Sequence, residues 1–316
     1  MKKLFVVVAA LMAVCSLSAQ TPDLVTAYNA AAAAYSAKNY AVAASEFDKT
    51  IQLGAASEDA EDLKLVATAK SSIPKCYFFL GGGAIQKGAL EEALTNFQKS
   101  ADLAELYGDQ QQADRSKMWI GRSYQAQGGN AFNAKDYTKA AAAFEKGYQV
   151  DPSNVAMMLN LGMSYCEINR YPEGMDMLYK VTINKDPRYA KEVAEANRMM
   201  ALYTNNEVAK LQKAKDYTGI LTMADEILKL DANNPIAHKV RVQAYSDKKD
   251  YAKVIELAAA AAAVQTDAAD ASTIYYLLGS AYNANELKPQ AIATLKKVVA
   301  GPSVAAARAA VAELSK

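Results

Sequence analysis

Few side chains in this 316-residue sequence are able to do catalytic chemistry. His238 is the only histidine, so a Ser-His-Asp triad or a histidine-based metal site would have to use this one residue. No nucleophile-elbow sequence accompanies it, and no ligands recur at metal-binding spacing. We therefore predict a protein that is not an enzyme and has no cofactor and no metal site. The expected role of His238 is to fill space between two helices.

Three consecutive glycines at positions 81–83 suggest a phosphate-binding loop at first sight. They lie inside a segment of helical periodicity instead of after a strand, and no Gly-Lys-Ser/Thr sequence follows them. Close helix packing explains Gly81. Gly82 and Gly83 each cost a helix about 1 kcal/mol relative to alanine, and a close approach by a ligand backbone stays open as their purpose.

The first 19 residues have the pattern of a secretory signal peptide. Two lysines precede an apolar run over residues 4–14, which is too short to span a bilayer. We expect cleavage after Ala19. Lipid attachment at Cys15 is the alternative, although Val14 stands where a lipobox prefers a small residue. The mature chain is expected to be exported, as a periplasmic, outer-membrane-associated or secreted protein without a transmembrane span.

Charge gives no reason to expect a nucleic-acid partner. Removal of residues 1–19 takes away two lysines and no acids, which leaves 33 basic against 34 acidic side chains. A chain with almost balanced charge lacks the basic surface that phosphate backbones require.

The composition of the remaining chain favours helices. Alanine runs at 30–34 and 258–263 suit closely packed helices. Proline and glycine fall mostly between periodic segments, and no alternating pattern of β-branched residues competes with the helical period. We predict an all-α fold.

The clearest repeated unit spans residues 275–298. Small residues at Gly279 and Ala291 allow two helices to approach closely. The spacing matches the pattern W-x2-L-G-x2-Y followed by Ala-x3-Phe, so the unit resembles the 34-residue tetratricopeptide repeat. Its anchors are Tyr275, Leu278, Gly279, Tyr282, Ala291, Leu295 and Val298.

Tyrosines before the second helix of each unit give the repeat length. Tyr137 to Tyr171 and Tyr217 to Tyr251 are each 34 residues, whereas Tyr171 to Tyr217 is 46. The resemblance implies a right-handed α-solenoid of about six to seven helix pairs, closed by a capping helix after Ser303. We predict two arrays: residues 20–187, with four repeats and an inserted helix, and residues 188–316, with three repeats and the cap.

Two places depart from the regular repeat. Ser57, followed by acidic residues, is expected to cap an inserted helix that Pro74 breaks or kinks. Further on, the string from Ile120 to Tyr124 matches the first-helix pattern but lies seven residues too far upstream of Ala140. An elongated first helix would explain this offset, and a break at residues 128–129 is the alternative.

Cys76 and Cys166 remain after removal of the signal peptide. They lie two repeats apart, and in a stacked array each repeat contacts mainly its neighbours. We therefore expect no disulfide between them, and two buried thiols instead.

The resemblance also implies a groove lined by the first helices. It points to the following residues: Lys75, Phe78, Ile85, Leu159, Met163, Lys239, Gln243, Tyr276 and Asn283. The lysine and asparagine clamp by which some family members hold a C-terminal carboxylate is not reproduced. We therefore expect a scaffold or adaptor for a protein or peptide in the cell envelope, and a homo-oligomer is also compatible with the exposed alanines. The alternative is a glycan or other small-ligand binder of an outer-membrane uptake system, for which Trp119, the only tryptophan, supplies little stacking surface.

Overall fold

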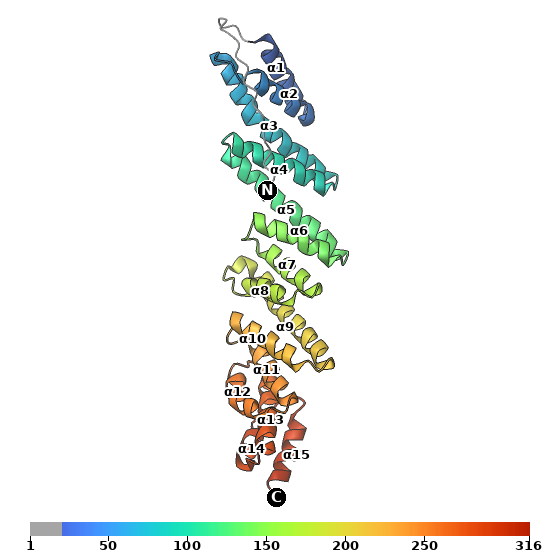
Figure 1. Cartoon of the computed structure of the whole chain (residues 1–316), viewed down its shortest axis with the longest axis vertical. Helices are drawn as coiled ribbons and strands as arrows, with labels where there is room; N and C mark the ends of the chain where they lie inside the picture. The colour runs from blue at the N-terminus through green and yellow to red at the C-terminus, as the bar shows by residue number, and fades with distance from the viewer. Residues whose placement is uncertain (1–20) are drawn as a thin grey trace. The chain divides into compact units, whose positions relative to one another are not determined.

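The computed structural model describes residues 21–316, so the expected signal peptide lies outside the described residues. Over this range the chain forms fifteen α-helices and one 3-10 turn, and no strand (Figure 1). The predicted all-α fold is confirmed. The chain forms two compact units, which divide between Gln127 and Gly128.

The first unit contains two helix pairs and most of a fifth helix. Each pair is antiparallel because only three residues separate its helices. The helices are α1 (Pro22–Ser36), α2 (Tyr40–Leu53), α3 (Ala60–Gln86), α4 (Leu90–Leu106) and α5 (Gln110–Asn133), which contains the division between the units.

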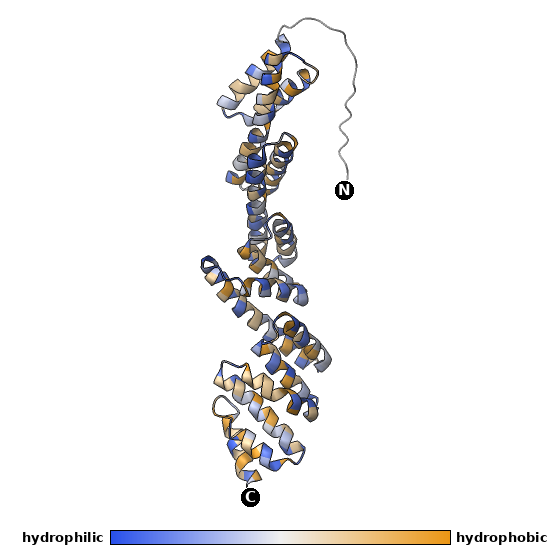
Figure 2. Ribbon diagram, turned by 90° about the vertical axis from the view of Figure 1, so that its left-hand side faces the viewer, coloured by the Kyte–Doolittle hydropathy of each residue, from blue (hydrophilic) through white to orange (hydrophobic). Residues whose placement is uncertain are grey.

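The second unit contains the end of α5 and all later helices. They are α6 (Tyr137–Val150), α7 (Val155–Glu167), α8 (Tyr171–Thr182), α9 (Ala190–Lys213), α10 (Tyr217–Leu230), α11 (Pro235–Asp247), α12 (Tyr251–Ala263), α13 (Ala268–Ala284), α14 (Lys288–Leu295) and α15 (Val304–Leu314). A short 3-10 turn, η1 (Pro187–Tyr189), precedes α9. Figure 2 shows hydrophobic and hydrophilic residues alternating along these helices, as expected where one face of each helix packs on a neighbour.

One turn conformation closes every helix pair. A residue with positive φ stands two positions before each second helix, and the next backbone N–H donates to the carbonyl five residues back at 2.8–2.9 Å. This is the Schellman type of helix end, which satisfies carbonyls that the helix leaves unpaired. The seven positive-φ residues are Lys38, Gly88, Lys135, Asn169, Lys215, Lys249 and Glu286. Seven turns agree with the predicted six to seven helix pairs.

The packing of the third pair explains its unusual sequence. Helix α5 runs without a break through Gly128 and Gly129, so the predicted elongated helix is confirmed. A Cβ at Gly128 would lie 2.6 Å from the ring of Phe144. Gly128 therefore makes the close helix contact, although the upstream string from Ile120 gave the better match to the repeat pattern.

Of the two outcomes predicted for Pro74, a break or a kink of the inserted helix, the break does not occur. Helix α3 continues through Pro74, because its first half packs in the core of the first pair and its second half packs against α4. The proline carbonyl accepts a hydrogen bond of 2.7 Å from the Ser100 hydroxyl on α4. Ser57 is also not the cap. Asp59 accepts the backbone N–H groups of the first turn, while the Ser57 hydroxyl accepts the N–H of Asp59.

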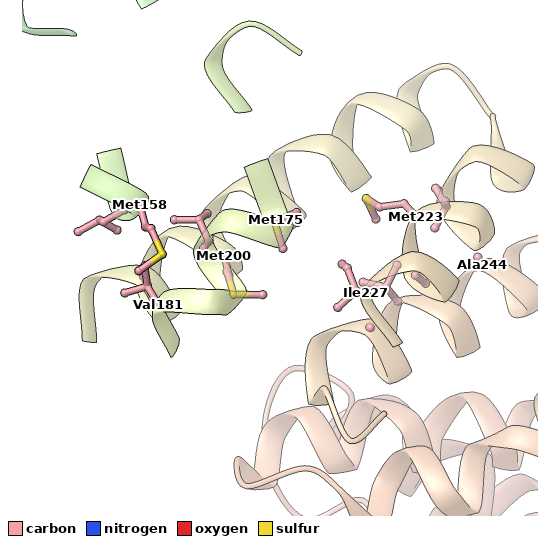
Figure 3. Packing of buried hydrophobic residues seen from close by; sticks show 14 of the residues in the cluster. Met158, Met175, Val181, Met200, Met223, Ile227 and Ala244 are labelled. Carbon is pink, nitrogen blue, oxygen red and sulfur yellow. The ribbon is translucent and has the colours of Figure 1, made fainter. Parts of the chain in front are cut away.

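The expected array boundary at residues 187/188 lies inside the second unit. There, α7, α8, α9, α10 and α11 share one hydrophobic cluster. Figure 3 shows Met158, Val181 and Met200, from three of these helices, gathered in this cluster. Flexible methionine side chains fill irregular gaps, which suits a place where the repeat interval lengthens.

Helix α15 covers the last helix pair as predicted. Its residues Val304, Ala307, Val311 and Leu314 pack in one cluster with Leu295 and Val298. Among residues 21–316, no helix combines the length and the apolar character that a membrane span requires.

Candidate functional site

A polar hollow of about 200 Å³ lies over three first helices of the second unit, α9, α11 and α13. Its lining combines three amide side chains, an ion pair, a hydroxyl and two valines. The lining residues are Asn205, Val208, Gln212, Lys239, Val240, Gln243, Asp270 and Thr273.

Helix α9 supplies two of the amides. Asn205 and Gln212 are seven residues apart, or about two helical turns, so they lie on one face of the helix. Both side chains are exposed, and neither amide bonds any other group in the described part of the chain. Each therefore offers one carbonyl acceptor and two N–H donors to an external ligand.

An ion pair links the other two helices. The Lys239 ammonium on α11 lies 2.6 Å from a carboxylate oxygen of Asp270 on α13. Asp270 stands in the first turn of α13, where the helix dipole also favours a negative charge. A partly exposed pair of this kind contributes about 1 kcal/mol or less to stability, and its effect on the hollow is to place one cation and one anion beside the amides.

Gln243 lies one turn after Lys239 on α11. Its Nε2 donates to Asp247 at 2.8 Å, and its carbonyl oxygen accepts no hydrogen bond from the described residues. Lys239 and Gln243, two of the predicted groove residues, both line this hollow. That they bind a ligand stays a prediction.

The other groove candidates of the second unit lie elsewhere. Leu159 is buried in the large cluster around α7 to α11, and Met163 packs against it. Tyr276 packs against the cluster under α15. Asn283 is exposed at the end of α13 and does not line the hollow.

In the first unit, the predicted groove residues surround an aromatic cluster. Phe78 is buried, its ring lies 5.4 Å from that of Phe97, and the Arg115 guanidinium lies 4.1 Å above it. Ile85 packs at the edge of the same cluster. Lys75 is half-buried on α3. These positions are compatible with a surface beside the cluster, but ligand binding there also stays a prediction.

Sequence reasoning missed Asn205, Gln212 and Asp270. The repeat of α9 was recognised only from its second helix, because Val208 stands where clearer repeats have glycine. In those repeats the glycine lies 12 residues before a small or buried residue of the second helix, as Gly279 does before Ala291. Counting 12 residues back from Ile220 gives Val208. This register would have placed Asn205 and Gln212 on the face of α9 that lines the hollow.

Two further hollows have mainly apolar linings. One, of about 250 Å³, lies between α8 and α10, and one, of about 360 Å³, lies between α14 and α15. The smaller hollow over α9, α11 and α13 is the better candidate, because its amide groups have hydrogen-bonding capacity that the described chain does not use.

No family model matches this sequence, and no curated protein matches it. Solved structures of tetratricopeptide repeat proteins resemble it weakly. The TPR2AB domain of yeast Sti1, in a complex with pHSP90, is 14% identical over 93% of this chain and 98% of its own, with a TM-score of 0.33. A tetratricopeptide repeat protein of Parabacteroides merdae is 10% identical over 93% and 99%, also with a TM-score of 0.33. Similarity at this level identifies neither a family nor a ligand.

The remaining reactive side chains are engaged in the fold. The ring nitrogen Nε2 of His238 lies 2.9 Å from the carbonyl oxygen of Ala232. Cys76 and Cys166 are free thiols, and burial raises the pKa of each to about 12. A thiol that stays protonated is a poor nucleophile. Within residues 21–316, no three acidic, histidine or cysteine side chains gather where they could hold a metal ion.

Proposed function

We propose that the protein is an exported scaffold that binds an extended segment of another protein in the hollow over α9, α11 and α13. The observation that carries the proposal is the set of amide side chains in this hollow. Asn205 and Gln212 on α9, together with the Gln243 carbonyl on α11, have donors and acceptors that the described chain leaves unpaired.

Amides suit a peptide ligand because a peptide backbone itself offers alternating N–H donors and C=O acceptors. An extended segment has no internal partners for these groups and gains them on binding. Such contacts depend little on the ligand's sequence. The fixed Lys239–Asp270 pair adds one cation and one anion, which would select for a partner with polar or charged side chains at that point.

The proposed location is the cell envelope, either the periplasm or the outer membrane. Its support is the signal-peptide pattern of residues 1–19, which lie outside the described residues. Fractionation of the native host, with a mass measurement of the mature N-terminus, tests this part separately from the binding function.

The alternative of a glycan-binding protein gains no support from the tryptophan. The Trp119 ring is stacked on Phe97 with a centroid distance of 5.7 Å, and the Arg122 guanidinium lies 5.2 Å from it. Sugar recognition by stacking needs an accessible aromatic face, and here Phe97 covers one face of the ring.

Affinity capture tests the binding function. The mature chain, residues 20–316, would be crosslinked mildly in envelope extracts of its host, and the captured proteins identified by mass spectrometry. We expect the triple variant Asn205→Ala, Gln212→Ala, Gln243→Ala to lose the main partner by at least about tenfold, since each lost hydrogen bond weakens binding by about 1 kcal/mol.

Asn197→Ala is the matched control, because Asn197 is an exposed amide on α9 whose Nδ2 bonds the backbone carbonyl of Val193. It should retain the partner. A triple variant that captures the same proteins as the control would refute binding through this hollow. Heat released by an oligosaccharide in calorimetry, lost in the triple variant, would support the glycan alternative instead.

A further inference from the structure

The hollow of about 360 Å³ between α14 and the capping helix α15 has mainly aliphatic walls. Leu295 and Val298 are buried in the fold, whereas Val299 has 72% of its surface exposed, more than any other large hydrophobic residue described. A ligand that covers this valine would remove apolar surface from water, which is favourable. The lining residues are Leu295, Lys296, Val298, Val299, Arg308, Val311 and Ala312.

Both walls of this hollow are anchored in the fold. The hydroxyl oxygen of Ser272, a buried residue of α13, accepts the backbone N–H groups of Val299 and Ala300, each at 3.1 Å. The other wall, α15, packs in the hydrophobic cluster that contains Leu295 and Val298. A ligand therefore finds the hollow already formed, which lowers the cost of binding.

Two cations, Lys296 and Arg308, are the only polar side chains among the described lining residues. Neither forms an ion pair or a hydrogen bond with another described residue. Lys297, which follows Lys296, lies over the ring of Tyr275 instead, with its ammonium 5.4 Å from the ring centroid. Ammonium and guanidinium groups are hydrogen-bond donors without any acceptor. The polar part of a ligand must therefore accept hydrogen bonds, and a negative charge suits it best.

No side-chain carboxylate within residues 287–316 neutralises these two cations. Glu313 is the single acid in this segment, which contains five basic side chains. It follows Arg308 by five residues, which at 3.6 residues per turn places it about 140° further round α15. This end of the second unit is therefore positively charged, although the whole chain is almost balanced with 35 basic and 34 acidic side chains. An anion is the complementary ligand.

The lining suits a small ligand better than a peptide. A peptide backbone offers N–H donors as well as C=O acceptors, and no side chain of this lining is an amide or any other acceptor. The volume of about 360 Å³ is also near the lower end of small-molecule sites, which span about 300–1,000 Å³. The matching ligand has one anionic group and an otherwise apolar body.

We propose that this hollow binds an aliphatic carboxylate, such as the anion of a medium-chain fatty acid. The hydrocarbon chain lies against Val298, Val299 and Val311 and covers the exposed valine. The carboxylate lies between Lys296 and Arg308, whose guanidinium can bind both carboxylate oxygens in parallel. This site shares no lining residue with the hollow over α9, α11 and α13, so it is a second binding function beside the one proposed above.

Calorimetric titration of the purified protein with octanoate tests the proposal. We expect binding at one site. The uncharged analogue 1-octanol has the same chain length and should bind at least about tenfold more weakly, because it lacks the charge-assisted hydrogen bonds to the two cations.

Two variants change the lining in different ways. Lys296→Gln with Arg308→Gln removes both cations and should weaken octanoate binding by at least about tenfold, to the affinity of 1-octanol. Ala312→Leu keeps the charges and fills part of the hollow, so it should weaken the binding of octanoate and 1-octanol alike. Ala312 is exposed and leucine is a good helix former, so α15 should still fold in this variant.

Lys248→Gln with Lys288→Gln is the matched control, because it removes two exposed cations of the second unit that do not line the hollow. It should bind octanoate as the wild type does. The triple variant of Asn205, Gln212 and Gln243 should also bind octanoate normally, so a failure of this proposal is distinguishable from a failure of the proposed function.

Four results would overturn the proposal. They are no octanoate binding by the wild type, equal binding by the wild type and Ala312→Leu, an equal loss in the control and the double variant, and binding to phosphatidylglycerol vesicles or to an acidic peptide without binding of octanoate. NMR of the wild type gives a decision without any variant. Nuclear Overhauser contacts between the Val299 methyl groups and the octanoate chain support the site, and their absence in the saturated complex overturns it.

Discussion

The helix pairs of this protein use two opposite solutions at the same crossing. In four pairs, the first helix contributes glycine and the second contributes a large residue 16 positions later: Gly81 with Phe97, Gly128 with Phe144, Gly162 with Leu178 and Gly279 with Leu295. In the pairs α9–α10 and α11–α12, the first helix contributes valine and the second alanine: Val208 with Ala224 and Val242 with Ala258.

The difference indicates that the two facing side chains at a crossing must together fill a given volume, and that neither position requires a particular residue. Val242, Ala258 and Ala224 are fully buried, as are Phe97 and Phe144 in the glycine pairs. Interiors pack densely, so a large side chain on one helix requires a small one opposite it. A search for the glycine alone finds the first kind of pair and misses the second, which explains why the repeat of α9 was recognised only from its second helix.

The largest change in stability is expected when the glycine and leucine of one crossing are replaced by valine and alanine. In the glycine pair of α13 and α14, a Cβ at Gly279 would lie 2.6 Å from Cγ of Leu295. Gly279→Val should therefore destabilise this pair by about 3 kcal/mol through overpacking, and Leu295→Ala by about 3 kcal/mol through a cavity. The double variant recreates the Val–Ala arrangement and should recover about 2 kcal/mol relative to the sum.

Hydrogen exchange of the amides of α13 and α14 is the suitable measurement, because a repeat array opens locally and its unfolding is not a single transition. The reverse exchange, Val242→Gly with Ala258→Leu, is the matched test in the other kind of pair. Strictly additive losses in both double variants would show that the paired residues do not compensate each other.

The second prediction concerns Tyr165, three positions after Gly162, and the dependence of stability on pH. Burial, and then a hydrogen bond of 2.7 Å to Glu145, raises the pKa of Tyr165 to about 12, from an ordinary value of about 10. The unfolded chain ionises this phenol first, so the stability it confers is complete below about pH 10 and is lost as the pH rises to about 12. Each pKa unit corresponds to about 1.4 kcal/mol, so the loss amounts to at most about 3 kcal/mol.

Tyr165→Phe keeps the ring in the core and removes the ionisation. The slope of stability against pH between 10 and 12 should therefore be smaller in this variant than in the wild type, which denaturant unfolding at several pH values can measure. If the two slopes are equal, the phenol of Tyr165 ionises as easily in the folded protein as in the unfolded chain.

The sequence predicted the helical fold, the pairing of the helices and the cap, because these depend on periodicity and on turns that recur at a fixed interval. The break that it allowed at Pro74 does not occur, because packing on both sides of the proline outweighs the missing backbone donor. Two of its predicted groove residues, Lys239 and Gln243, line the hollow, and they lie in a repeat of regular length. It did not point to Asn205 and Gln212, because Val208 stands where the clearer repeats have the glycine that marks the register of the first helix.

The smallest change in stability is expected for alanine substitutions at two kinds of glycine, those packed against the second helix and those with open space beside them. A Cβ at Gly81 would lie 2.7 Å from the Phe97 ring, whereas one at Gly82 would meet no atom within 4 Å, and Gly129 beside Gly128 is equally open. Alanine has the higher helix propensity. Gly82→Ala and Gly129→Ala should each stabilise the chain by about 1 kcal/mol, while Gly81→Ala should destabilise it.

Hydrogen exchange of the amides of α3 and α5 in these three variants compares neighbouring positions under the same conditions, and the gain in helix propensity from glycine to alanine is common to all of them. Only contact with Phe97 then distinguishes Gly81 from Gly82. If Gly81→Ala is also stabilising, the ring moves aside at little cost, and the small residue is not required at this crossing. If Gly82→Ala stabilises the chain but reduces capture of the proposed partner, the open glycine serves an approaching ligand, and the first unit contributes to binding as well.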